Sequence, residues 1–140
     1  MARVAPPRRL GTPEPEAVEL ELGAIAESQR AQIVSYLQGA EALVAGGYWT
    51  DPVTEDPEDS IPFALMTDGE YVWSSPWAFL VGRYGAALPD EFMRHMSSKN
   101  FQAPELSEEV VYEIGVREGI IPSDEFWAAL EAGDAEQNGH

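Results

Sequence analysis

Thr-Asp-Gly-Glu-Tyr-Val-Trp-Ser-Ser-Pro-Trp, residues 67–77, is the stretch that decides the fold of this chain. Asp68-Gly69 separates two strand-like runs, residues 61–67 and 70–74. An Asp-Gly pair favours a type I′ turn because both central residues of that turn need a positive φ. The stretch therefore predicts an antiparallel hairpin at the centre of the chain.

A helix is expected directly after this hairpin. Ser75 can accept a hydrogen bond from a free amide of the first turn, and Pro76 suits the first helical position because its missing N–H is not needed there. The helix should run to about Tyr84, where Gly85 can end it in a left-handed conformation.

The remaining elements follow from apolar periodicity and capping residues. Alternation predicts a short strand over 18–22, although a helical reading of that segment stays open. Gly46-Gly47 is expected at a turn. Four more helices are predicted, over residues 28–38, 89–96, a segment from 107, and 124–131. Ser28, Ser107 and Ser123 are the expected caps of the first, third and fourth of these helices. The fold class is thus α+β, a small antiparallel sheet packed against several short helices.

The domain organisation is simple. With 140 residues, of which 44% are hydrophobic, the chain is long enough for one domain with a real core. Residues 1–15 are rich in proline and lack periodicity, so we expect a flexible N-terminal tail, a single globular domain over 16–132 and a flexible tail over 133–140. The alternation along 71–73 places Trp73 in the core.

Charge restricts the kinds of partner. The formal net charge is −17 with only 8 Lys and Arg residues, so direct binding of nucleic acid or of an anionic membrane surface is disfavoured. A cationic partner is favoured instead. The chain has no cysteine, no apolar stretch of signal-peptide length and no membrane-span candidate, which fits a cytoplasmic protein.

The acidic loop 51–60, Asp-Pro-Val-Thr-Glu-Asp-Pro-Glu-Asp-Ser, raises the question of a metal. An EF-hand calcium loop needs Gly at its sixth position and a bidentate Glu at its twelfth. Counted from Asp51, Asp56 and Pro62 occupy those positions, so the spacing fails. We therefore expect neither a metal site nor a cofactor, and interpret the loop as solvated.

One pair of side chains could serve in catalysis. His95, the only histidine before the last residue, follows Glu91 by one helical turn, and such a pair could act as a general acid/base with its orienting carboxylate. No nucleophile motif or phosphate-binding glycine loop accompanies it. The sequence therefore predicts a non-enzymatic protein, with a small enzyme using Glu91 and His95 as one alternative.

Aromatic residues beside the acidic loop are the better lead. Aromatic rings among carboxylates suit an interface that recognises Arg or Lys side chains. The predicted partner-binding residues are Tyr48, Trp49, Asp51, Glu55, Asp56, Glu58 and Asp59.

A resemblance adds to this reading. Ser60-Ile-Pro-Phe63, Thr67–Trp73, Tyr84-Gly85 and Leu88-Pro-Asp-Glu-Phe92 with His95 resemble a group of small acidic uncharacterised actinobacterial proteins, similar in size and charge to immunity proteins of bacterial toxin systems. The resemblance covers about residues 28–96 and implies a cytoplasmic protein-binding protein. We expect an immunity or inhibitor protein that neutralises a basic partner such as a toxin. A DNA-mimicking regulator and an acidic secretion chaperone are the alternatives among binding proteins.

Overall fold

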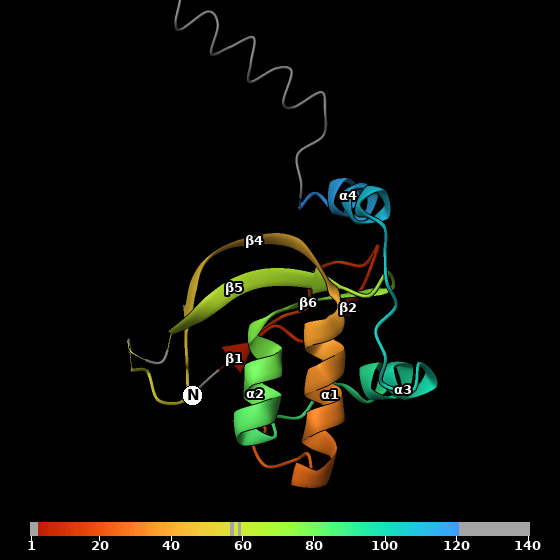
Figure 1. Cartoon of the computed structure of the whole chain (residues 1–140). Helices are drawn as coiled ribbons and strands as arrows, with labels where there is room; N and C mark the ends of the chain where they lie inside the picture. Colours follow the sequence, from red (N-terminus) through yellow and green to blue (C-terminus); the bar gives the residue numbers. More distant parts are fainter. Residues whose placement is uncertain (1–2, 57, 59, 121–140) are drawn as a thin grey trace, which may run out of the picture.

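The structure is a computed structural model that describes residues 3–56, 58 and 60–120, and it confirms the α+β class (Figure 1). A four-stranded antiparallel sheet has the strand order β2-β6-β5-β4, and a second, two-stranded sheet pairs β1 with β3. In chain order the elements are β1 (Arg3–Val4), β2 (Arg8–Arg9), β3 (Val18–Glu19), α1 (Glu27–Gly39), β4 (Glu41–Thr50), β5 (Ser60–Thr67), β6 (Tyr71–Ser74), α2 (Pro76–Tyr84), α3 (Asp90–Ser98) and α4 (Glu108–Arg117). None of the described helices combines the length and the apolar character needed to cross a bilayer.

The longest strand, β4, lies where the sequence suggested no strand. It pairs with β5 over its whole length, but the register shifts between Ala42 and Val44 and again between Ala45 and Tyr48. Each shift is a β-bulge, which bends the strand and increases its twist. The turn expected at Gly46-Gly47 is wrong, since the two glycines form the second bulge, where Gly47 has a φ of 74° that favours glycine.

β5 and β6 pair in antiparallel fashion, with Thr67 opposite Val72. The connection between them is not the expected type I′ turn, because only Gly69, with a φ of 96°, has a positive φ there. The Asp68 side chain holds the turn instead: its Oδ1 accepts the amides of Glu70 at 2.9 Å and Tyr71 at 2.7 Å. A side-chain acceptor thus replaces the backbone geometry that the Asp-Gly pair suggested.

Helix α2 has the predicted bounds, and Gly85 ends it as expected with φ 62° and ψ 38°. Ser75 is not a side-chain cap, however. Its hydroxyl accepts the Ala64 amide at 2.9 Å, and its own amide donates to the Ala64 carbonyl at 2.8 Å. Ser75 therefore continues the contact of β6 with β5 up to the first helical residue.

The other described helices match the predicted segments within a few residues. Phe92 and Met96 of α3 are fully buried, and Ser107 caps α4 by accepting the Val110 amide at 3.2 Å. Ser28 is not a cap, since α1 begins one residue before it. The helix predicted over 124–131 and the tail over 133–140 lie outside the described residues.

Part of the segment predicted as a flexible tail, residues 3–12, contacts the rest of the domain. Arg8 and Arg9 form β2, which pairs with β6, and the Trp77 indole N–H donates to the Ala5 carbonyl at 3.0 Å. Arg8 Nη1 lies 2.7 Å from Glu118 Oε1, and both side chains of this pair are largely buried. Proline content suggested disorder, but arginine contacts with distant carboxylates fix the segment.

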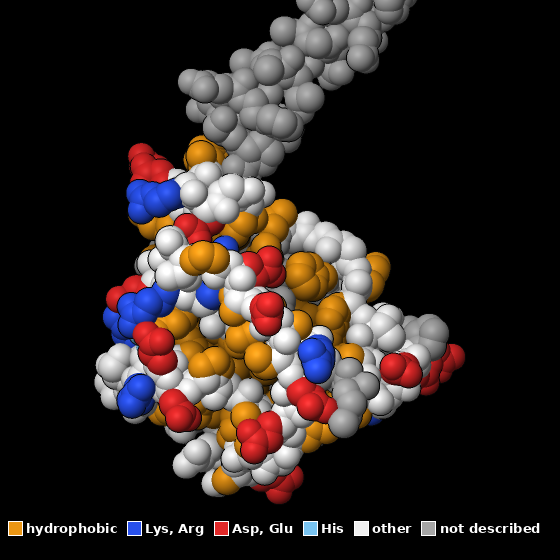
Figure 2. All heavy atoms as spheres, turned by 180° about the vertical axis from the view of Figure 1, so that it is seen from behind, with side chains coloured by type: hydrophobic (Ala, Val, Ile, Leu, Met, Phe, Trp, Pro, Cys, Tyr) orange, Lys and Arg blue, Asp and Glu red, His pale blue; other side chains and the backbone are white. Residues whose placement is uncertain are grey.

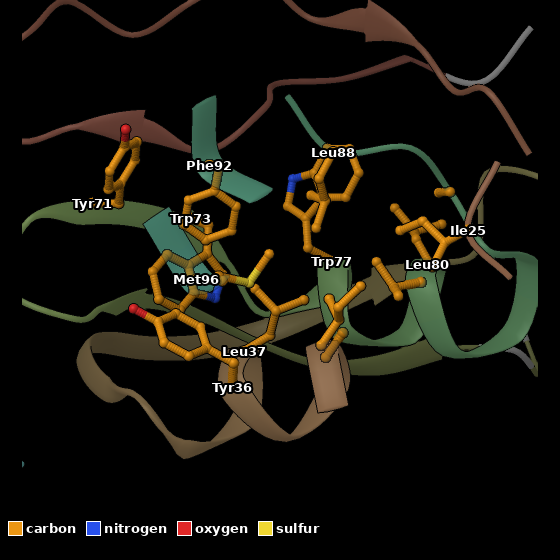
Figure 3. Close-up of a cluster of buried hydrophobic side chains, with 14 residues drawn as sticks. Ile25, Tyr36, Leu37, Tyr71, Trp73, Trp77, Leu80, Leu88, Phe92 and Met96 are labelled. Atoms are coloured by element: carbon orange, nitrogen blue, oxygen red, sulfur yellow. The ribbon is translucent and has the colours of Figure 1, made fainter. Parts of the chain in front are cut away.

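Alternation along β6 places side chains in two cores. Tyr71 and Trp73 face α1, α2 and α3, where they pack with Tyr36, Phe92 and other buried side chains (Figure 3). Val72 faces the opposite side and packs with Leu43 of β4 and Ile114 of α4. Figure 1 shows the same division, with α1 and α2 on one side of the sheet and α4 on the other.

Replacement of Trp73 by Ala should cost about 3–5 kcal/mol of unfolding free energy. Trp73 is 3% exposed, and its ring centroid lies 6.1 Å from that of Tyr36 and 5.3 Å from that of Phe92, so the substitution leaves a cavity. Denaturant unfolding measures the loss. Tyr48→Ala is the matched control, because Tyr48 is 79% exposed. An equal loss in the two variants would contradict the assigned core.

Candidate functional site

The acidic loop connects β4 to β5 at one end of the four-stranded sheet (Figure 1). Its base is closed by the pair Thr50 and Ser60, whose hydroxyl oxygens lie 3.2 Å apart. The described residues of the predicted partner-binding set therefore lie at the end of β4 and in the loop that follows it.

Tyr48 and Trp49 are neighbours with different surroundings. Tyr48 is 79% exposed, the highest value among the large exposed hydrophobic residues described. Trp49 is half-buried, and its ring meets Phe79 of α2 edge-on, with centroids 6.5 Å apart. Tyr48 is thus available for contact, whereas Trp49 fixes the end of β4 against the helices.

Asp51 is not part of a solvated loop, because its side chain is fully buried. Its Oδ2 accepts the Tyr84 hydroxyl at 2.5 Å and lies 3.4 Å from Arg83 Nη1, while its Oδ1 accepts the Val53 amide at 2.8 Å. Desolvation acts to raise the pKa of the Asp51 carboxyl, but these hydrogen bonds and the nearby guanidinium together lower it below its ordinary value. Asp51 therefore anchors the loop to α2.

Beyond this anchor the described loop carboxylates face solvent. Glu55, Asp56 and Glu58 are exposed, and Asp56 Oδ1 accepts the Glu58 amide at 2.9 Å. No Lys or Arg side chain of the described residues forms an ion pair with these three acids. Asp59 lies outside the described residues. No group of three metal-ligating side chains occurs within 3–56, 58 and 60–120.

A second cluster of polar groups surrounds Asp68, whose side chain is 1% exposed. Asp68 Oδ2 accepts the Tyr36 hydroxyl at 2.5 Å and lies 2.6 Å from His95 Nε2. Glu70 Oε2 lies 3.5 Å from the same ring nitrogen and 3.4 Å from Lys99 Nζ. The cluster joins α1, α3 and the β5–β6 turn.

Burial decides what this Asp68 cluster can do. Desolvation, reinforced by the hydrogen bond to Asp68, raises the pKa of the Tyr36 phenol, which therefore stays a neutral donor. The His95 side chain is only 11% exposed. Both oxygens of the buried Asp68 carboxylate have polar partners, and the cluster leaves little access for a substrate. We refer to the cluster as a structural clamp, because it connects α1, α3 and the β5–β6 turn.

The pair predicted for an enzyme is not formed as expected. Glu91 accepts Arg9 Nε at 2.8 Å, and this contact lowers the pKa of the Glu91 carboxyl. His95 is oriented by Asp68 instead. Glu91 thus holds the N-terminal segment through Arg9 and does not orient His95.

One cavity lies between the N-terminal segment and the sheet. Its volume is about 480 Å³, and its lining includes Arg3, Arg8, Trp49, Phe63, Leu65 and Val72. Figure 2 shows the face opposite to Figure 1, where hydrophobic side chains gather in the middle and acidic side chains are spread around them. The Arg8 guanidinium is already bound by Glu118, so the cavity has an internal charge pair.

Comparisons with protein-family models, curated proteins and solved structures found no match for this chain. The resemblance to toxin-immunity proteins stays a prediction.

Sequence reasoning missed the Asp68 cluster, and one signal could have found it. Tyr36 falls on the buried face of α1 with Ile33 and Leu37. A buried tyrosine hydroxyl needs a polar partner, so this position predicts an acceptor on a neighbouring element. Which acceptor it is depends on the packing of the turn, which periodicity does not reveal.

Asp51→Asn should lower the unfolding free energy by about 1–3 kcal/mol near neutral pH, because a buried charged acceptor is lost. Since the folded pKa is depressed, the contribution of Asp51 is present above about pH 4 and is lost as the pH falls through the lowered value. Urea unfolding of wild type and variant at neutral and acidic pH should show the difference shrinking. The exposed Asp56→Asn is the control and should change stability little.

Tyr36→Phe should cost about 1–3 kcal/mol, because the buried Asp68 Oδ2 loses the hydrogen bond from the Tyr36 hydroxyl. The raised pKa of Tyr36 means that its contribution is complete below about pH 10 and is lost at higher pH. Unfolding curves at neutral and alkaline pH measure both effects. Tyr48→Phe, at an exposed position, should show neither, and a neutral result for Tyr36→Phe would remove the clamp from the account of stability.

Proposed function

We propose that this protein is a non-enzymatic immunity or inhibitor protein, which binds a basic protein partner such as a bacterial toxin and neutralises it. The binding surface consists of Tyr48 and the exposed loop acids Glu55, Asp56 and Glu58. We refer to these four residues as the Tyr48 surface.

The exposure of Tyr48 carries the proposal. The fold buries Tyr36 completely and Tyr71 almost completely, yet it leaves Tyr48 79% exposed at the end of β4. Exposed aromatic side chains next to carboxylates favour contact with Arg and Lys, through ring faces and through charge. Nothing in the packing of the described residues requires a tyrosine at this position.

The loop acids add direction. Glu55, Asp56 and Glu58 face solvent without a cationic partner among the described residues, so their field is not cancelled locally. Residues 10–82 of the sequence hold thirteen acids and only Arg30 as a basic residue. Such a field accelerates the encounter with a positively charged protein.

Asp51 and Trp49 have a supporting role. Asp51 fixes the start of the loop through Tyr84, and Trp49 fixes the end of β4 through Phe79. A partner would therefore meet the Tyr48 surface on a base that is already ordered, which lowers the entropic cost of binding.

The first test is kinetic. Basic proteins captured from the source organism are purified. Their association with this protein and their dissociation from it are then measured by surface plasmon resonance at low and at high salt. The association rate should fall steeply with salt, because steering is screened over roughly 8–10 Å at physiological ionic strength, while dissociation changes less. An acidic partner, or an association rate that is indifferent to salt, would overturn the proposal.

A charge-matched pair of variants tests the location. Combined Glu55→Gln, Asp56→Asn and Glu58→Gln should slow association about tenfold or more and leave stability nearly unchanged. The control removes the same charge with Glu105→Gln, Glu109→Gln and Glu113→Gln, which are exposed in or just before α4, at the far end of the molecule from the loop (Figure 1). Equal effects of the two triples would indicate net charge alone, and unchanged binding of the loop variant would reject the Tyr48 surface.

A further inference from the structure

β4 is an edge strand. It lies last in the order β2-β6-β5-β4 and runs along the outer side of β5 (Figure 1). One side of its backbone is therefore free of a neighbouring strand in the described structure. An open edge carries a row of amides and carbonyls that can pair with another chain.

The register tells which residues point their backbone groups outward. Ala64 directs its amide and its carbonyl to Ser75, on the side of β6, so these groups point away from β4. Ala64 and Ala45 therefore form a non-hydrogen-bonded pair, in which the backbone groups of both residues point away from the partner strand. The amide and carbonyl of Ala45 thus point to the open edge.

The same argument applies to Tyr48, which lies opposite Pro62. The Pro62 carbonyl accepts the Ser75 hydroxyl on the side of β6, so the backbone groups of Tyr48 also point to the open edge. By alternation along β5, the backbone groups of Thr50, opposite Ser60, point outward too. The backbone groups of Val44 and Trp49 point toward β5 instead.

This edge lacks the protection that soluble proteins usually give to exposed strands. Residues 44–48, Val-Ala-Gly-Gly-Tyr, are all exposed and include no charge and no proline. Lysine, proline or a covering loop normally prevents pairing at such a place. The bulge at Gly46-Gly47 limits a flat, continuous edge but leaves outward-pointing groups on both of its sides.

We infer that β4 is a docking edge to which an extended, basic segment of the partner protein adds as a further strand. The inference rests on the proposed function and specifies how the partner binds. Backbone groups of Ala45, Tyr48 and Thr50 supply the hydrogen bonds. Tyr48 and the loop acids lie beside the added strand, where they contact its Lys and Arg side chains.

Charge selects this occupant over a second copy of the chain. Two copies joined edge to edge would each bring a net charge of −17 and would place their acidic loops and Glu41 near the same interface. A basic strand removes that repulsion and gains charge-assisted contacts, in the manner of known strand-addition complexes.

Amide hydrogen exchange of the full-length protein, measured residue by residue by NMR, tests the inference. The probe is an acetylated and amidated peptide of four Lys-Val repeats, and the control peptide has four Glu-Val repeats. The amides of Ala45, Tyr48 and Thr50 should exchange quickly in the free protein and about tenfold or more slowly with the basic peptide. Those of Val44 and Trp49, which face β5, should change little. Protection at other sites alone would overturn the inference.

Ala45→Pro and Ala45→Thr form a matched pair at this edge. Proline removes the outward amide without breaking the pairing with β5, and threonine keeps the amide with a side chain of similar size. Affinity for the basic peptide should fall about tenfold in the proline variant and stay near wild type in the threonine variant. Melting temperatures establish that both are folded, and Tyr48→Ala provides a second reading if the proline variant unfolds, since it should weaken binding by removing the aromatic contact.

The outcomes separate the two proposals. If the basic peptide and basic proteins bind but the edge amides gain no protection, strand addition is wrong and the proposed function stands. If the acidic peptide protects the edge equally, strand addition stands and the basic partner is wrong. A dimer of the free protein that protects these amides, detected by sedimentation, would replace the partner strand by a second copy and overturn the inference.

Discussion

The Asp68 carboxylate is the interaction on which the arrangement of the helices and the sheet depends. Burying a charge is costly unless every lone pair finds a donor. Here Oδ1 accepts two backbone amides of the turn, and Oδ2 is shared by Tyr36 of α1 and His95 of α3. The rings of Tyr36, Trp73 and Phe92 pack against one another beside this point, so the polar cluster and the aromatic core are in direct contact through Tyr36.

The cost of burying a charge also explains which carboxylates stay exposed for binding. Two of the carboxylates with a structural role, Asp51 and Asp68, are buried and accept several hydrogen bonds each. Those without one stay on the surface, and the loop after β4 presents three of them. Between the two groups runs an uncharged backbone edge. The exposed loop acids can therefore attract a cationic partner over a distance, whereas the open backbone edge of β4 can bind it only on contact.

The central part of the fold could be predicted from sequence because its signals are local. Pro76 and Gly85 mark the bounds of α2 by their own backbone preferences, and Ser107 caps α4 through an amide three residues away. β4 could not be predicted, since two bulges destroy the alternation that identifies a strand. The N-terminal strand was missed because its order comes from Glu91 and Glu118, separated from Arg9 and Arg8 by 82 and 110 positions.

For the candidate site, exposure was the property that the sequence could not provide. Tyr48 and Trp49 are adjacent and aromatic, yet only the packing against Phe79 distinguishes them. Asp51 and Asp56 look alike in a proline-interrupted acidic loop, but Tyr84 and Arg83 draw the first of them into the interior. Composition indicated the kind of partner, and three-dimensional contacts were needed to choose the residues.

The early strand β2 has a consequence for the order of assembly during synthesis. Its partner β6 and the carboxylate of Glu118 are made long after Arg8 has left the ribosome. β2 can therefore join the sheet only after β6 has been made, and it does so through contacts of long sequence separation. Until β2 joins, β6 and β4 are the outer strands of this sheet. Afterwards β2 takes the outer place of β6.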